Sequence, residues 1–253
     1  MNSASSYLET ADIETSSEEY AARFSGAVGA WFLKIQEEAT LRMLIPYAGA
    51  TVLDVGGGHG QLTGALVRKG YRVTVLGSAD VCQARIAKFI HQGHCAFRVG
   101  NILALPYPDR AFEVVVSYRL LPHVSRWPQV LRELTRVARR AVLIDYPAVR
   151  SVNWIAPCLF KFKKSLEGNT RPFTCFKEAE LLEVVGQCGF VPGDRYAEFF
   201  LPMILHRILR WPSFSSGTEA VFRLLGITAW FGSPVILKLL RAHRQAGFLH
   251  SEV

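Results

Sequence analysis

The stretch Val52-Leu53-Asp54-Val55-Gly56-Gly57-Gly58-His59-Gly60 decides the fold of this chain. It reads as a short apolar strand that carries an acid near its end and turns through glycines towards a helical segment at 62–69. Glycines tolerate positive φ and let a ligand approach the backbone closely. The N-terminus of the following helix favours a negatively charged group. The pattern therefore predicts a ligand-binding turn after the first strand of an α/β sheet.

Two other kinds of glycine turn are excluded by spacing. The dinucleotide fingerprint G-x-G-x-x-G needs a third glycine, and the residues at the required positions are Gln61 and Thr63. A phosphate-binding P-loop is excluded as well, because no Gly-Lys-Ser/Thr sequence follows the turn.

Strands and helices alternate along the rest of the chain. We predict strands at 51–55, 71–76, 96–99, 112–117, 141–145, 190–199 and 234–241, with helices at 80–91, 127–138 and 177–188 among those between them. This rhythm predicts a Rossmann-like α/β fold, with a doubly wound, mostly parallel sheet of seven strands and helices on both faces.

The two ends of the chain are expected to be helical additions to one domain spanning 1–253. Residues 1–15 are predicted to be a frayed tail, and 1–46 a helical cap with a helix opened by Ser16-x-x-Glu19 and a second helix at 31–45. Residues 50–146 form the predicted cofactor-binding core. Residues 199–233 are predicted to form a helical lid, in which a loop at 212–217 separates two helices.

Composition restricts the partners. The chain has 253 residues and a formal net charge of +8, but no Lys/Arg stripe, so we expect no nucleic acid partner. Its five cysteines form no Cys-x-x-Cys pair, which predicts reduced thiols in a cytoplasmic protein and no metal site. The apolar stretch 221–240 is interrupted by charged residues and glycines, so a membrane-spanning helix is excluded.

Several motifs together carry a family resemblance. The spacing Asp-x-Gly-x-Gly-x-Gly at 54–60 resembles motif I of the class I S-adenosylmethionine-dependent methyltransferases. Residues 99–115, which include Leu105-Pro106 and Phe112-Glu113-Val114-Val115, resemble a later motif of that family, and Leu121-Pro122-His123-Val124 resembles the turn that follows it. The resemblance covers about 50–146 and is nearest to the ubiquinone- and menaquinone-pathway enzymes. It implies S-adenosylmethionine as the cofactor and methyl transfer as the reaction.

The resemblance also implies roles for individual residues in the cofactor site. Asp54, Gly56, Gly58 and Gly60 would hold the methionine part, Asn101 would accept a hydrogen bond from the adenine amino group, and Ile102 and Ser117 would lie against the cofactor. The family places an acid that grips the ribose at the end of the second strand, where this chain has Gly77. Either the Ser78 hydroxyl makes one weaker hydrogen bond to the ribose, or the Asp80 side chain reaches back to the ribose.

The acceptor site is less sharply indicated. His123 and Asp145 are candidate bases, because His123 follows the fourth strand and Asp145 ends the fifth, at the edge where open α/β sheets bind substrates. Tyr20, Tyr118 and Tyr146 are candidate substrate contacts. Residues 199–241 mix large apolar side chains with arginines, which favours a small apolar or lipid-like acceptor and peripheral membrane contact, against plain core packing as the alternative. A non-catalytic cofactor-binding protein is the alternative function, because of Gly77.

Overall fold

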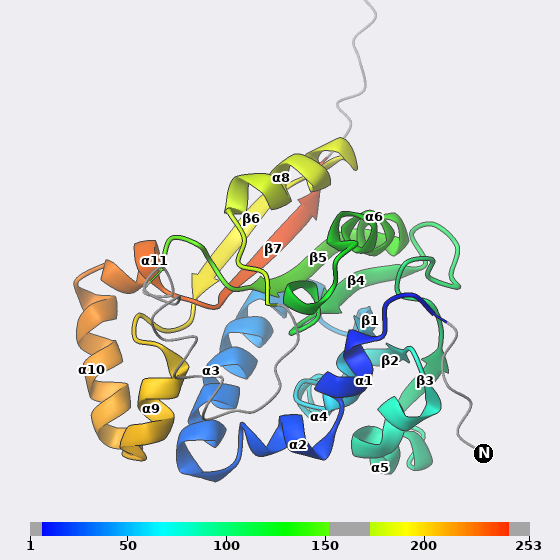
Figure 1. The fold of residues 1–253 in the computed structure, drawn as a ribbon. Helices are drawn as coiled ribbons and strands as arrows, with labels where there is room; N and C mark the ends of the chain where they lie inside the picture. The colour runs from blue at the N-terminus through cyan, green and yellow to red at the C-terminus, as the bar shows by residue number, and fades with distance from the viewer. Residues whose placement is uncertain (1–6, 152–172, 243–253) are drawn as a thin grey trace, which may run out of the picture.

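Seven strands form one sheet in the computed structural model, which describes residues 7–151 and 173–242 (Figure 1). The strands are β1 (Thr51–Val55), β2 (Arg72–Gly77), β3 (Cys95–Val99), β4 (Phe112–Ser117), β5 (Ala138–Tyr146), β6 (Phe190–Ala197) and β7 (Val235–Arg241). Their order is β3-β2-β1-β4-β5-β7-β6. β1 to β5 pair in parallel, whereas β7 is antiparallel to both β5 and β6. The predicted fold class is confirmed.

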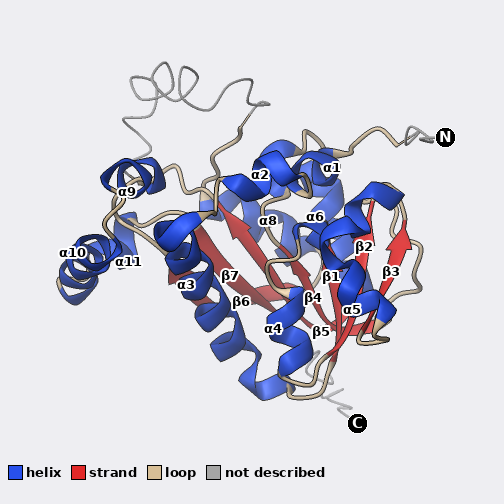
Figure 2. Cartoon of the chain, turned by 90° about the horizontal axis from the view of Figure 1, so that it is seen from below, coloured by secondary structure: helices blue, strands red, loops and turns tan. Residues whose placement is uncertain are grey.

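Helices cover both faces of the sheet because the strands are apolar on both sides (Figure 2). Leu53 and Val55 of β1 pack under α6 (Trp127–Val137) and α8 (Glu178–Gln187). Val52, one residue out of phase, packs on the other face with α3 (Gly26–Leu44) and α4 (Thr63–Arg68).

The strand order reverses between β1 and β4, and the chain's first helices lie at that edge. Ligands of open α/β sheets bind at such a switch point, outside the carboxyl ends of the strands. α1 (Ala11–Thr15) contacts the glycine turn, and α2 (Glu18–Ala22) follows it along the same edge (Figure 2). Residues 11–15 are therefore not the frayed tail that we predicted, because Ala11 and Asp12 are buried against the sheet. Residues 1–6 lie outside the described residues.

Three local predictions were wrong in detail. Ser17, not Ser16, caps α2 by accepting a hydrogen bond from the Tyr20 amide at 3.1 Å. The long N-terminal helix begins at Gly26, not at 31. Gly29 lies inside it, where a Cβ atom would approach the Phe24 carbonyl within 2.2 Å. Residues 80–86 form a 3-10 helix, η3 (Asp80–Ile86), and only α5 (Ala87–His91) is α-helical.

The insertion between β6 and β7 consists of α9 (Met203–Leu209), α10 (Pro212–Leu224) and α11 (Ile227–Phe231), which group beside α3 (Figure 1). The loop predicted at 212–217 belongs to α10, since Pro212 stands at the first helical position, where proline is favourable. Glu219 anchors the group. Its carboxylate lies 3.0 Å from the His206 ring and accepts hydrogen bonds from the backbone amides of residues 200 and 201.

Among the residues that the structure describes, no helix has both the length and the apolar character needed to cross a membrane.

Candidate functional site

The glycine turn after β1 requires its glycines. Gly56 and Gly60 have φ values of 76° and 70°, and they flank the short 3-10 helix η2 (Gly57–His59). A Cβ atom on Gly57 would lie 2.1 Å from the Asp54 carboxyl, and one on Gly58 would lie 2.3 Å from the Cys82 carbonyl oxygen. Side chains are therefore excluded from the centre of the turn.

Asp54 lies beneath this turn as a buried acid, and no described residue supplies a counter-charge to it. It has no exposed surface, and neither carboxyl oxygen has a hydrogen-bond partner in the described part of the chain. Burial raises the pKa of the Asp54 carboxyl to about 7. A buried carboxyl without a partner beside a glycine turn suits a ligand that brings a positively charged donor.

The turn after β3 forms the other side of the expected cofactor site. Ile102 is fully buried in the same cluster as Leu53 and Leu76. The side-chain oxygen of Asn101 accepts a hydrogen bond of 2.9 Å from the Leu103 amide. One lone pair of that oxygen remains for the predicted bond from adenine.

The end of β2 contains an acid that sequence reasoning missed. A Cβ atom at Gly77 would lie 2.7 Å from the Cys82 Cβ, so an acidic side chain fits this position only if neighbouring atoms shift. Instead, the carboxylate of Asp12 accepts hydrogen bonds from the backbone amide and the hydroxyl of Ser78, both at 2.6 Å. Asp12 is fully buried, whereas Asp80 is exposed. The acid at this strand end therefore comes from α1, 66 residues earlier in the chain.

A second buried polar group occupies the ends of β4 and β5. Ser117 donates a hydrogen bond of 3.0 Å to the Val55 carbonyl. The Arg119 amide donates to the Asp145 carboxylate at 2.6 Å, and its guanidinium donates to Gln36 at 3.2 Å. Burial raises the pKa of Asp145 to about 6, although the positive charge of Arg119 opposes that shift.

Glu198 completes this polar group and was also missed from the sequence. It directly follows β6 and is 1% exposed, and its carboxyl oxygens have no hydrogen-bond partner among the described residues. Burial raises the pKa of Glu198 to about 8, with Arg119 opposing the shift and Asp145 reinforcing it. Glu198 is therefore largely protonated at neutral pH.

The other predicted base, His123, and two of the predicted tyrosines lie elsewhere at this edge. Tyr118 is buried, and its hydroxyl lies 3.0 Å from that of Thr40 on α3. Tyr20 packs with Phe24, 5.8 Å between ring centroids. His123 ends the 3-10 helix η4 (Leu121–His123), and its partly exposed ring lies 5.7 Å from that of Phe173.

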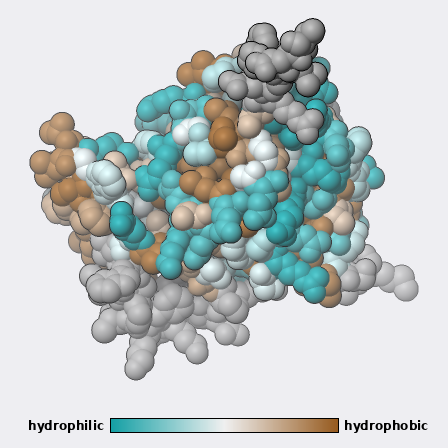
Figure 3. Space-filling model, turned by 90° about the horizontal axis from the view of Figure 1, so that it is seen from above, coloured by the Kyte–Doolittle hydropathy of each residue, from teal (hydrophilic) through white to brown (hydrophobic). Residues whose placement is uncertain are grey.

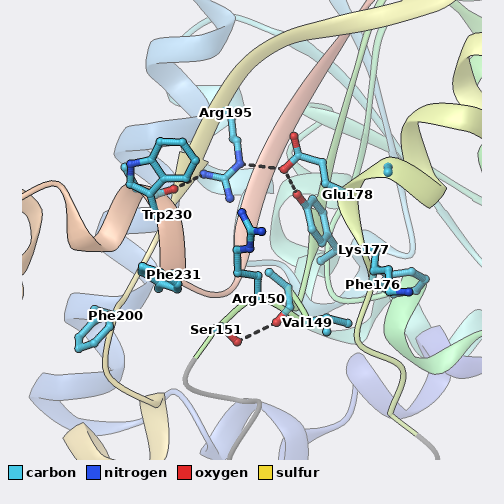
Figure 4. Close-up of a pocket in the computed structure, with 14 residues that line it drawn as sticks. Val149, Arg150, Ser151, Phe176, Lys177, Glu178, Arg195, Phe200, Trp230 and Phe231 are labelled. Carbon is cyan, nitrogen blue, oxygen red and sulfur yellow. Dashed lines mark hydrogen bonds and ion pairs between the residues drawn. The ribbon is translucent and has the colours of Figure 1, made fainter.

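A cavity of about 1240 Å³ opens beyond the carboxyl end of β5 (Figure 4). Its lining is mainly aromatic and aliphatic, with three cations and one acid. The aromatic residues are Tyr146, Phe176, Phe200, Trp230 and Phe231, and the charged residues are Arg150, Lys177, Arg195 and Glu178.

Glu178 organises one wall of this cavity. It accepts a hydrogen bond from the Tyr146 hydroxyl at 2.5 Å and one from Arg195 at 2.8 Å. Burial and the neighbouring carboxylate raise the pKa of Tyr146. Of the three tyrosines predicted to contact substrate, Tyr146 is the one that lines the cavity, whereas Tyr20 and Tyr118 are not in its lining.

Known proteins share this fold and these motifs. Residues 53–144 match the family model described as "Methyltransferase domain". The chain is 37% identical over 92 residues to the malonyl-[acyl-carrier protein] O-methyltransferase of Halorhodospira halophila, a match that covers 34% of this chain and only 30% of that relative. It is 27% identical over 197 residues to the demethylmenaquinone methyltransferase of Tropheryma whipplei, covering 69% of this chain and 80% of the relative.

A solved structure agrees with the fold. The magnesium protoporphyrin IX methyltransferase of Synechocystis PCC 6803, determined with bound SAH, superimposes with a TM-score of 0.63 at 13% identity. The match covers 89% of this chain and 94% of that one.

Proposed function

Since this chain is a class I S-adenosylmethionine-dependent methyltransferase, we propose that it methylates a small apolar acceptor that lies in the cavity beyond β5. The single observation that carries the choice of acceptor is the aromatic lining of that cavity. The relative that acts on demethylmenaquinone supports an acceptor of this apolar kind.

The residues of the glycine turn fit the methionine end of the cofactor. We assign the contact with its ammonium group to the Asp54 carboxylate, which is otherwise buried without a partner. The backbone of Gly56, Gly58 and Gly60 lets that end approach the turn. When bound, the cofactor supplies a methyl group that its sulfonium has already activated.

Asp12 takes the place of the missing ribose acid in this proposal. Its carboxylate accepts two bonds from Ser78 and one from the Cys82 thiol, and a carboxylate has about four acceptor positions, so one position remains for a ribose hydroxyl. α1 contacts the glycine turn, so the N-terminal helix would contribute directly to cofactor binding. Ile102 and Asn101 are assigned to the adenine, and Ser117 to the strand end behind the cofactor.

Methyl transfer depends mainly on alignment of the nucleophile and exclusion of water. An acceptor that must lose a proton needs a base, and we retain Asp145 and His123 for that role. Asp145 does not line the cavity but lies at the end of β5 against Arg119. A carboxyl with a pKa of about 6 is ionised at neutral pH. If Asp145 is the base, activity should rise as pH increases through about 6, and Asp145→Asn should abolish this rise. If His123→Gln abolishes the rise instead, the histidine is the base.

The proposal is tested by calorimetry followed by an acceptor screen. S-adenosylhomocysteine should bind the wild-type chain, NAD should not, and Gly58→Val should abolish binding, because a side chain at 58 meets the Cys82 carbonyl. Methylation should then appear on a panel of quinones, phenols and lipids that starts with demethylmenaquinone. Far-ultraviolet circular dichroism checks that Gly58→Val still folds.

The alternative function is a cofactor-binding protein without turnover. Gly77 is the observation that favours it, since the usual ribose acid is absent from β2. Binding of S-adenosylhomocysteine without methylation of any acceptor would support this alternative. Methylation of any member of the panel would eliminate it.

A further inference from the structure

The insertion carries most of the exposed large hydrophobic side chains of the described chain. Ten of the fifteen such residues lie between 205 and 231, and the other five are scattered. The ten are Leu205, Ile208, Leu209, Trp211, Phe214, Val221, Leu224, Leu225, Trp230 and Phe231. We call these ten residues the insertion face. Hydrophobic residues gather at the left edge of Figure 3, on the side where α9 to α11 lie in Figure 1.

The polarity of the insertion is inverted relative to an ordinary surface helix. The buried residues of its three helices are all polar: His206 on α9, Ser215 and Glu219 on α10, and Thr228 on α11. Meanwhile Trp211 is 63% exposed and Leu224 is 87% exposed. A surface helix normally turns its apolar stripe inward, and contiguous exposed apolar side chains mark a contact with another apolar phase.

The charges of the insertion all have one sign at the surface. Residues 201–231 contain three arginines, Arg207, Arg210 and Arg223, and a single acid, Glu219. Glu219 is 4% exposed and is paired with His206 on the inside. The Arg223 guanidinium donates hydrogen bonds to the Ala197 and Glu198 carbonyls. Arg210 is therefore the exposed cation beside the apolar side chains, Arg207 is partly buried, and the insertion exposes no acid.

The insertion face continues into the cavity. Trp230 and Phe231 belong to the face and also line the cavity beyond β5 (Figure 4). An apolar molecule bound at this end of the face would therefore also contact the wall of the cavity.

We propose that the insertion face binds the surface of an anionic lipid bilayer, and that the acceptor reaches the cavity from that bilayer, a second step that rests on the proposed function. Apolar and tryptophan side chains accompanied by arginines match the boundary between acyl chains and anionic headgroups. A second copy of the chain fits less well, because symmetric pairing of this face would bring its arginines together with no exposed acid to compensate.

The test is flotation of the full chain with vesicles of phosphatidylcholine, with and without phosphatidylglycerol. Wild type should float with the anionic vesicles. Trp211→Ser combined with Leu224→Ser should weaken partitioning by at least about tenfold, because two large side chains no longer insert. Ile45→Ser combined with Val191→Ser is the matched control, since these residues are exposed by 70% and 45% outside the insertion. This pair should float like wild type.

Charge is tested by a second matched pair. Arg210→Glu should weaken binding to the anionic vesicles by about thirtyfold, the effect of reversing one charge near such a surface. Arg132→Glu changes the net charge equally at an exposed position of α6, and it should have little effect. Thermal unfolding of all four variants checks that each still folds.

The proposal is overturned if wild type does not float with anionic vesicles, or if the insertion variants float as well as their controls. It is also overturned if light scattering finds a dimer that Trp211→Ser with Leu224→Ser dissociates, because a second copy would then cover the face. Flotation needs no cofactor, so it separates the two proposals. Flotation without any methyl transfer would support bilayer binding by the insertion face and contradict the proposed methylation. Methylation of a detergent-dissolved acceptor without flotation would support the proposed methylation and contradict bilayer binding.

Discussion

Replacing Asp12 by asparagine should weaken the binding of S-adenosylhomocysteine by about 10- to 150-fold. The side chain is fully buried at the end of β2, where an acid in place of Gly77 would fit only if neighbouring atoms shifted. A hydrogen bond to a charged group contributes about 1.5–3 kcal/mol, and this range converts to the stated loss of affinity. Isothermal titration calorimetry measures the dissociation constant directly.

Asp80→Asn is the matched control, because it removes the same charge from an exposed acid three residues after Gly77. Its affinity should equal that of wild type. The 2′-deoxyribose analogue of S-adenosylhomocysteine then completes a cycle: wild type should bind it more weakly, while Asp12→Asn should hardly distinguish the two ligands. If Asp12→Asn binds as tightly as wild type or more tightly, α1 merely covers the site and the reasoning fails. A loss in Asp80→Asn instead would assign the ribose to Asp80.

Three further predictions concern folding. Gly77→Asp, which restores the acid usual in the family, should lower the free energy of unfolding in urea by about 1–3 kcal/mol, because its Cβ meets that of Cys82 at 2.7 Å; unchanged stability would refute this close packing. Glu219→Ala should lower the same quantity by about 3 kcal/mol or more, since two backbone amides and His206 lose their acceptor, whereas Glu180→Ala on the exposed surface should change little. The pKa of Glu198 is raised from 4.5 to about 8 in the folded chain. Between these pH values the folded state binds more protons than the unfolded state, so the free energy of unfolding falls as pH rises, by about 1.4 kcal/mol for each pH unit. Glu198→Gln should remove this slope from urea titrations measured at a series of pH values.

The sheet could be predicted because its signals are local. Residues 51–55 and 112–117 match β1 and β4 to the residue, since apolar runs end there at glycines or polar turns. The glycine turn was equally readable, because its positive φ values at Gly56 and Gly60 need glycine. The antiparallel closing strand was found from an apolar run after Pro234.

Long-range contacts account for what the sequence did not reveal. α1 has only five residues and no apolar period, and its order comes from the bonds between Asp12 and Ser78, which no local pattern encodes. Arg119 had a usable signal, because it is a charged residue one position beyond the end of the apolar strand β4. Glu198 directly follows β6, whose mixed sequence gave a weaker signal. The insertion was misjudged at 212–217 because serines and glycine there suggested a loop, whereas Pro212 begins a helix.

The raised pKa of Asp54 links the charge of the cofactor to its binding. A carboxyl with a pKa near 7 is about half protonated at neutral pH, because burial opposes its charge and no cation among the described residues offsets that effect. A bound ammonium group would favour the carboxylate, so binding should release a fraction of a proton near pH 7. Calorimetry in buffers with different ionisation enthalpies would then give different apparent binding enthalpies, with a slope equal to the protons released. Asp54→Asn removes the titrating group and should abolish most of that slope while the chain stays folded. A zero slope in the wild-type chain would mean that the ligand's ammonium does not reach Asp54.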